Sequence, residues 1–378
     1  MRYLACAALS VIAFDAYGSH WSDLNDECQA KLAGADYEGA NRVCAATLAE
    51  AEKTVPNSDL HAVAINNLVM ISANQGRYAE AEALEKQELA IWEKAVGPDH
   101  PNVALSLNNL GDLYYSQRQY RQAEPFYLRA LAIREKALGA GHPDVATTVS
   151  DLAETYIGED KDALARPLLE RSLALREKTL GPEHPDVALG LTNLAALDVR
   201  QKKFAQAEPL LERAVAIRNK QLGPDHLDLA TSLAQLANCY ARLGKFSKAE
   251  PLFKRALAMR QKLLGPENLL VAASQNDLAD FYYSRGKLAI AQPLYESSLA
   301  IREKLLGRQN PDVADSLFNL ATLHRSRGQY AQAGPLYERA LAIREKVLGP
   351  DDPSTQVARN SLKAFRFDMR AAAPRPLP

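Results

Sequence analysis

One interval dominates this sequence: a glycine that closes an apolar stretch returns every 42 residues. The series is Gly97, Gly139, Gly181, Gly223, Gly265, Gly307 and Gly349. A fixed period of this length is typical of a repeat array, in which each unit buries its apolar face against its neighbours. The length of 378 residues, which would otherwise suggest two or three globular domains, therefore does not decide the architecture.

Each unit carries two apolar series, as the stretch from Pro101 to Pro143 shows. The first series is Val103, Leu107, Leu110 and Tyr114, and the second is Ala123, Phe126, Tyr127, Ala130, Leu131 and Ile133. Spacings of three and four are typical of a helix with one buried face. Polar residues 116–119 separate the two series, and Gly139 follows as a left-handed helix terminator. The unit is therefore predicted to be a pair of antiparallel helices.

Small residues recur where neighbouring helices should meet. One position in the first helix reads Gly111, Ala153, Ala195, Ala237, Ala279, Ala321, and one in the second reads Ala81, Ala123, Ala165, Ala207, Ala249, Ala291, Ala333. A large residue such as Tyr127 or Phe253 follows beside them. Small side chains allow close helix approach, so we expect large and small residues to interlock between hairpins.

The ends of the chain differ from the array. Residues 1–18 begin with Arg2 and an apolar run, which predicts a signal peptide; the alternative is a first helix that caps the array. Residues 19–58 are predicted to be a degenerate first helical repeat, and 59–353 an array of seven 42-residue repeats. The apolar residues Val357, Leu362, Phe365 and Met369 make one face of 354–370 and predict a capping helix. Residues 371–378, rich in proline, are predicted to be a disordered tail.

Cysteine usage bears on the compartment. Cys28 and Cys44 lie on the two expected helices of the first repeat, where they either form an intramolecular disulfide or act as small buried apolar residues. Cys239 is expected to lie in the core. If the signal is real, the protein is exported to a periplasm or secreted; the alternative is a cytoplasmic location.

The pattern of Leu107, Leu110, Gly111, Tyr114, Ala123, Tyr127 and Ala130 resembles a tetratricopeptide repeat. The 42-residue period, with Leu-Asn-Asn-Leu ending at Leu110 and a second-helix run ending at Gly139, is similar to the kinesin light chain type. The resemblance covers roughly residues 60–350. It implies an all-α, right-handed superhelical solenoid of helix hairpins, which in this chain number about eight and precede the capping helix.

The resemblance also implies that the first helices line a concave groove, with the residues that flank the recurring leucine pointing into it. The candidate peptide-binding residues are Asn66, Asn67, Asn108, Asn109, Asp112, Asp151, Glu154, Asn193, Arg200, Gln235, Asn238, Arg242, Asn276, Asp277, Asp280 and Asn319. An amide offers donors and an acceptor, so a row of amides suits the backbone of an extended chain. The alternative is architectural: the amides bond neighbouring helices and fix the repeat spacing.

Charges in the expected groove favour a particular ligand. Acidic residues lie toward both ends, whereas Arg200 and Arg242 lie near the middle. We therefore expect a segment with Lys or Arg near its ends and an acidic group centrally.

Three details of the helices carry further expectations. The recurring Arg-Glu-Lys run, such as 134–136, is expected to form a solvated face. Trp92 replaces that arginine once, either as an exposed contact or packed against the first repeat. Asp162 and Asp198 replace aromatic residues, so residues 155–205 are predicted to contain a soft joint that opens locally.

Other functional classes lack support in the sequence. There is no phosphate-binding loop and no zinc-protease or serine-hydrolase signature, and we predict neither an enzyme nor a cofactor. His100, His142, His184 and His226 recur one repeat apart, too far to share a metal. A net charge of −1 argues against nucleic acid, and after the N-terminal run no stretch is apolar enough to span a membrane.

The sequence thus predicts a non-enzymatic scaffold that binds a protein or an extended peptide segment. An alternative is a regulatory peptide sensor whose superhelix changes pitch on binding, and a third is a subunit that accompanies an enzyme.

Overall fold

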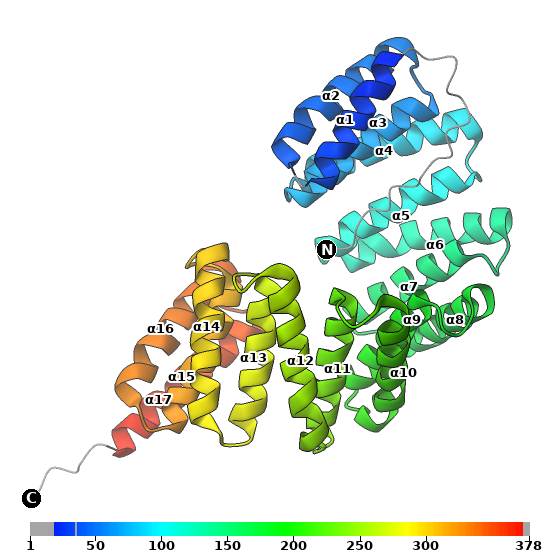
Figure 1. The fold of residues 1–378 in the computed structure, drawn as a ribbon. Coiled ribbons are helices and arrows are strands. Elements are labelled where there is room, and N and C mark those ends of the chain that lie inside the picture. The colour runs from blue at the N-terminus through cyan, green and yellow to red at the C-terminus, as the bar shows by residue number, and fades with distance from the viewer. Residues whose placement is uncertain (1–18, 35, 373–378) are drawn as a thin grey trace, which may run out of the picture. The chain divides into compact units, whose positions relative to one another are not determined.

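The computed structural model describes residues 19–34 and 36–372, and all regular structure in this part is helical (Figure 1). The helices are α1 (Ser19–Ala33), α2 (Tyr37–Thr54), α3 (Asp59–Asn74), α4 (Tyr78–Val96), α5 (Pro101–Ser116), α6 (Tyr120–Leu138), α7 (Pro143–Gly158), α8 (Asp162–Leu180), α9 (Pro185–Arg200), α10 (Phe204–Leu222), α11 (Leu227–Arg242), α12 (Phe246–Leu264), α13 (Leu269–Ser284), α14 (Leu288–Leu306), α15 (Pro311–Ser326), α16 (Tyr330–Val347) and α17 (Pro353–Ala372). Eight consecutive pairs followed by α17 confirm the predicted all-α array of hairpins. None of the described helices is long and apolar enough to cross a membrane.

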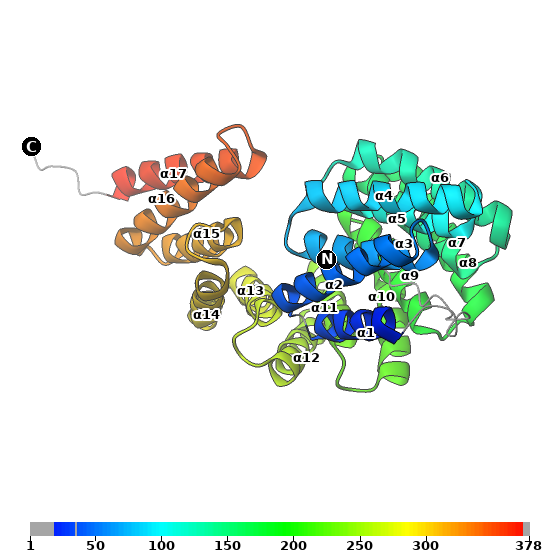
Figure 2. The same cartoon turned by 90° about the horizontal axis from the view of Figure 1, so that it is seen from above.

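The chain divides into two compact units between Leu197 and Asp198, near the end of α9. Consecutive helices pack together from α1 to α8 and from α10 to α17, and first helices of successive hairpins also meet, as α5 does with α7 and α11 with α13. Figure 2 shows α15, α16 and α17 side by side at the end of the second unit. The division falls inside residues 155–205, the predicted soft joint, whose local opening stays a prediction.

Large and small residues interlock as the sequence indicates. A Cβ atom added to Gly111 would lie 2.6 Å from Cε1 of Tyr127, so any larger residue there would require the ring to shift. Tyr127 is fully buried, and its hydroxyl donates a hydrogen bond of 2.6 Å to Asp112. Ala123 and Ala130, the small residues on the same second helix, are also fully buried.

The helix-ending glycines adopt positive φ, but their ψ differs from the left-handed helical value expected. Gly139 has φ 85° and ψ 148°, a combination that is essentially restricted to glycine. A second positive-φ position lies within each of the seven hairpin turns from α3–α4 to α15–α16, and the sequence pattern did not indicate it. It is occupied by Gly76, Arg118, Asp160, Lys202, Gly244, Gly286 and Gly328. Three successive turns therefore hold a side chain where the other four have glycine.

We expect Lys202→Gly to stabilise the protein by about 0.5–1 kcal/mol. Its φ of 59° costs a non-glycine residue about 1–2 kcal/mol, and glycine removes that cost while losing about 0.5–1 kcal/mol of chain entropy. The adjacent Lys203, at φ −87°, is the matched control, and Lys203→Gly should destabilise. Urea denaturation measures both. Equal shifts for the two variants would contradict the strain at Lys202.

The cysteine expectations are resolved within the described residues. Cys28 of α1 and Cys44 of α2 form a disulfide, with Cα atoms 5.1 Å apart, in a buried cluster with Leu68 and Ile71. Cys239 is a free, buried thiol, as expected, and donates to the carbonyl of Phe204. The predicted signal peptide, residues 1–18, lies outside the described residues, so export stays a prediction.

The last helix caps the second unit with a face slightly different from the predicted one. Ala358, Leu362 and Phe365 are buried, whereas Val357 and Met369 are 55% and 46% exposed. Buried residues at i, i+4 and i+7 define one stripe, and the two wrongly included residues lie beside it. The helix continues to Ala372, two residues past its predicted end. Residues 373–378 of the predicted tail lie outside the described part.

Candidate ligand-binding face

Amides on the first helices bond one hairpin to the next. In the first unit, Asn67 donates to Asn25 (3.1 Å), Asn108 to Asp151 (3.1 Å) and Asn193 to Ser150 (3.2 Å). In the second unit, Asn319 donates to Asn276 (3.0 Å). Each pair is about one repeat apart in sequence, so these bonds link neighbouring first helices, as the architectural interpretation requires.

Four candidate asparagines of the first unit are deeply buried. The exposed fractions are 9% for Asn66, 1% for Asn67, 6% for Asn108 and 2% for Asn109. Asn66 and Asn109 point toward α4, where they donate to Glu88 (3.3 Å) and Glu85 (3.4 Å). The chain itself occupies these amides, and peptide contact by them stays a prediction.

The two glutamates that receive these bonds form a buried acidic pair. Glu85 and Glu88 replace residues that are Tyr127 and Ala130 in the next repeat, and they are 0% and 3% exposed. Burial, and then repulsion by Glu88, raises the pKa of Glu85 well above its usual range. Burial raises the pKa of Glu88 to about 7. Trp92 donates to Glu88 (3.1 Å) and is itself 4% exposed, so it is buried and not an exposed contact, whereas its packing against the first repeat stays a prediction.

The second unit presents its candidate residues differently. Asn238 and Arg242 on α11 and Asp280 on α13 are exposed. Asp280 accepts from Asn276 (3.0 Å) and from the hydroxyl of Tyr295. Desolvation by the surrounding residues raises the pKa of Asp280, whereas the bond with Tyr295 and the charges of Arg302 and Arg242 lower it. Burial, together with repulsion by Asp280, raises the pKa of Asp277 to about 6.

The remaining candidates lie between these two extremes. Asp112 accepts from Tyr127, and Glu154 accepts from Asn193 at 3.0 Å. Asp151 is 9% exposed, Gln235 is half-buried, and Arg200 is exposed at the end of α9. The structure therefore brings together an acidic and amide cluster in the first unit and a mixed, accessible face in the second.

The expectation of a solvated face is wrong for the arginine of the Arg-Glu-Lys run. Arg134, Arg176, Arg218, Arg260 and Arg344 are each 6–7% exposed. The guanidinium of Arg260 donates to Ser274 (2.7 Å) and to the carbonyl of Leu270 (3.4 Å), both on the following first helix. Burial lowers the pKa of Arg260. The missed signal was a Ser or Thr 14 residues after most of these arginines, as in Arg134–Thr148 and Arg218–Ser232.

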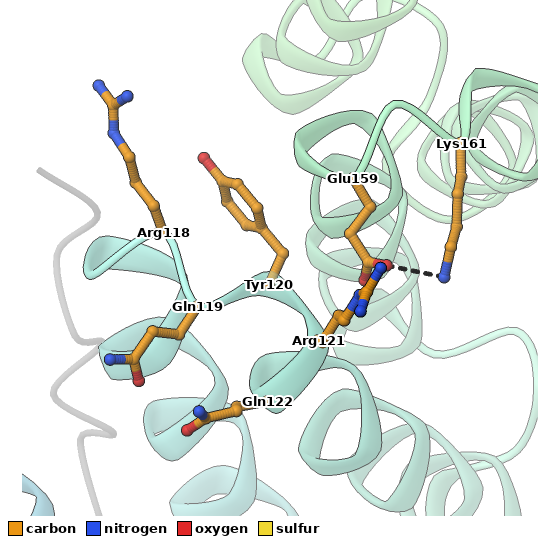
Figure 3. Close-up of a pocket in the computed structure, with 7 residues that line it drawn as sticks. All are labelled: Arg118, Gln119, Tyr120, Arg121, Gln122, Glu159 and Lys161. Carbon is orange, nitrogen blue, oxygen red and sulfur yellow. Dashed lines mark ion pairs between the residues drawn. The ribbon is translucent and has the colours of Figure 1, made fainter. Parts of the chain in front are cut away.

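A pocket of about 390 Å³ lies in the first unit, at the turn ends of α5–α6 and α7–α8. Its lining residues are Arg118, Gln119, Tyr120, Arg121, Gln122, Glu159 and Lys161. Figure 3 shows Arg118 on one side of Tyr120 and the Glu159–Lys161 ion pair, 2.7 Å long, on the other. None of the sequence-predicted candidates lines this pocket. In the described residues, no group of three His, Cys, Asp or Glu is placed to hold a metal ion.

Comparison with known families matches the tetratricopeptide repeat at residues 60–136, 117–178, 144–220, 186–262, 270–346 and 319–363. A second tetratricopeptide repeat profile matches residues 234–304. A search of curated proteins finds no match.

Solved structures of similar fold include three of interest. A putative kinesin light chain with nearly identical TPR-like repeats from Podosopora anserina is 31% identical over 54% of this chain and 97% of its own, with a TM-score of 0.48. BtubC (BKLC) from P. vanneervenii is 25% identical over 69% of this chain and 95% of its own, with a TM-score of 0.51. Aspartyl phosphate phosphatase F from Bacillus subtilis shares the fold at 14% identity, covering 81% of this chain and 76% of its own, with a TM-score of 0.60.

Proposed function

The chain belongs to the tetratricopeptide repeat family, and from that premise we propose that the second unit binds an extended peptide segment of a protein partner along its first helices. Repeats of this family support interactions between proteins, generally without chemistry of their own. The observation that carries the proposal is the exposed pair of opposite charges, Arg242 and Asp280, on adjacent first helices.

Accessible polar groups favour the second unit over the first. Amides of the first unit are buried and bonded internally, so a ligand there must displace existing partners, which leaves polar groups unpaired at a cost of about 1–3 kcal/mol each. Asn238, Arg242 and Asp280 are exposed, so a ligand can reach them at the surface, although Asp280 already accepts from Asn276 and Tyr295 and Asn238 donates to the carbonyl of Ala234. Asn238 and Arg242 lie on α11 and Asp280 lies on α13, and these two helices contact each other.

The order of charges sets the kind of segment. Arg200 and Arg242 come first along the chain, and Asp277 and Asp280 follow on the next first helix. An acidic stretch of the ligand fits over the arginines, and a basic stretch fits over the aspartates. The proposed ligand therefore has the central acidic group and one of the two basic ends that the sequence predicts for the ligand. The proposal concerns the second unit alone.

The test peptide is labelled and has about four glutamates followed by about four lysines. Arg242→Ala should weaken its binding by roughly tenfold, which corresponds to about 1.4 kcal/mol. Asp280→Asn should weaken it similarly, because the lysine end loses its partner. Fluorescence anisotropy with the full-length protein measures both. Arg255→Ala is the matched control, since Arg255 is an exposed arginine of the same unit that bonds Asn219 on the second-helix side.

An all-glutamate peptide and an all-lysine peptide of equal length test the order of charges. Arg242→Ala should affect only the former, and Asp280→Asn only the latter. If Arg255→Ala weakens the mixed peptide as much as Arg242→Ala, the first-helix face is not the binding surface.

A further inference from the structure

The hairpin turns of the second unit form an edge of one charge. In this unit the turns that join the first helix of a pair to the second are residues 201–203, 243–245, 285–287 and 327–329. They contain six Lys or Arg and no Asp or Glu. The loops between pairs, residues 223–226, 265–268, 307–310 and 349–352, contain four Asp or Glu and one Arg. Since helices in a hairpin are antiparallel, turns and loops lie at opposite ends of the helices, and charge separates between the two ends.

The basic turns are largely unneutralised. Lys245 pairs with Glu208 (2.6 Å), and Lys287 reaches Glu250 only at 4.0 Å. For Lys202, Lys203 and Arg285, the described part of the chain offers no acidic partner, and all three are exposed. The opposite end behaves differently, because Lys262 pairs with Asp225, and Lys304 pairs with Glu267 at 2.5 Å.

We propose that this basic edge, formed by Lys202, Lys203, Lys245, Arg285, Lys287 and Arg327, docks an acidic segment of a protein partner. Opposite charge is the recognition element, and a row of cations one hairpin apart matches an extended acidic chain. Hairpins about 10 Å apart correspond to about three residues of extended chain at about 3.3 Å each. Four turns thus accommodate about ten residues. This edge adjoins the first-helix face of the proposed function, because Arg200 and Arg242 are the last residues of α9 and α11, immediately before two of these turns.

Nucleic acid fits the edge less well than an acidic polypeptide. Binding of a single strand relies on aromatic faces on which bases stack. Here the aromatic rings near the turns are covered by the chain's own cations: Arg285 lies 3.9 Å from the ring centre of Phe246, and Lys248 lies 5.0 Å from that of Tyr240.

The first unit shows no comparable edge, because its turns at 75–77, 117–119 and 159–161 hold three basic and two acidic residues.

The test uses the full-length protein and a fluorescein-labelled oligoglutamate of about ten residues, the length that spans the four turns. The triple variant Lys202→Ala, Lys203→Ala, Arg285→Ala should bind at least about tenfold more weakly, and wild-type binding should fall steeply with added salt. The matched control removes three lysines from the opposite side of the same unit: Lys262→Ala, Lys304→Ala, Lys346→Ala. It should change the affinity by less than about twofold.

Thermal melts of both triple variants establish that each remains folded; these are exposed lysines and an exposed arginine, so their removal should change stability little. Equal weakening by the two triple variants overturns the proposal, because the attraction is then a property of overall charge. A single-stranded oligouridylate of equal charge, bound as tightly as the oligoglutamate, also overturns it and assigns the edge to nucleic acid.

Discussion

Replacing Glu85 and Glu88 together with glutamine should raise the free energy of unfolding at pH 8 by roughly 2–4 kcal/mol and change it little at pH 4. Both carboxyls are buried, and Oε2 of Glu85 accepts no hydrogen bond in the structure. Their folded-state pKa values are raised, so the neutral forms suit the fold. The stability that these groups contribute is full below the unfolded pKa of about 4.5 and is lost as pH rises through about 7, the folded value for Glu88.

Urea denaturation of the full-length protein, measured between pH 4 and pH 8, checks this expectation. Glutamine keeps the shape and the acceptor oxygen for Asn66 and Asn109, so the variant isolates the charge. Glu82 on the same helix is the control of opposite sign, because its pKa is lowered through bonds with Lys86 and Tyr114. Glu82→Gln should therefore destabilise at pH 8. A double variant with the same pH dependence as wild type would show that the pair does not titrate inside the fold.

Arg260→Ala should destabilise the second unit by about 2–4 kcal/mol, the largest expected loss from a single side chain on a second helix. The guanidinium bonds Ser274, Leu270 and also Thr231 (3.1 Å), so one side chain joins α12 to α13 and to α11. Alanine removes all three contacts and leaves the buried hydroxyl of Ser274 without its donor.

Two variants sharpen the measurement at Arg260. Lys262→Ala, two residues away on the exposed side, should cost less than about 0.5 kcal/mol, because a surface ion pair contributes little. Arg260→Lys keeps the charge but has no planar fork, so it should recover only part of the loss. The denaturation midpoints of Arg260→Ala, Arg260→Lys and Lys262→Ala measure these differences. A loss for Arg260→Ala as small as that for Lys262→Ala would mean that the arginine is a surface residue.

Periodicity made the fold predictable, because every hairpin repeats the same packing problem. The 42-residue glycine series located the helix ends, and the pairing of Gly111 with Tyr127 followed from alternating size alone. The positive-φ turns at Arg118, Asp160 and Lys202 were not predictable, since the residue types there do not reveal the backbone conformation that the two flanking helices impose.

The candidate site was predicted less well because amides serve two purposes. Sequence alone placed the asparagines on the right helices, but it did not show that Asn66 and Asn109 bond Glu88 and Glu85, which occur in only one repeat. In the second unit the residues at the matching repeat positions, among them Gln235, Asn276 and Asn319, are half-buried. The buried arginines were missed for a similar reason: a charged residue in a charged run looks solvated until its acceptors, 10 and 14 residues on, are known.

The arginine contacts have a consequence for how such a chain lengthens in evolution. Donor and acceptors are separated by 10 and 14 residues, well inside one 42-residue period, and each contact joins a hairpin only to the next. A tandem duplication of one period, wherever its breakpoints fall, restores both spacings across the new junction. The duplicated segment therefore supplies the arginine and the acceptors that connect it to its neighbours. Growth by whole periods requires no compensating substitution elsewhere.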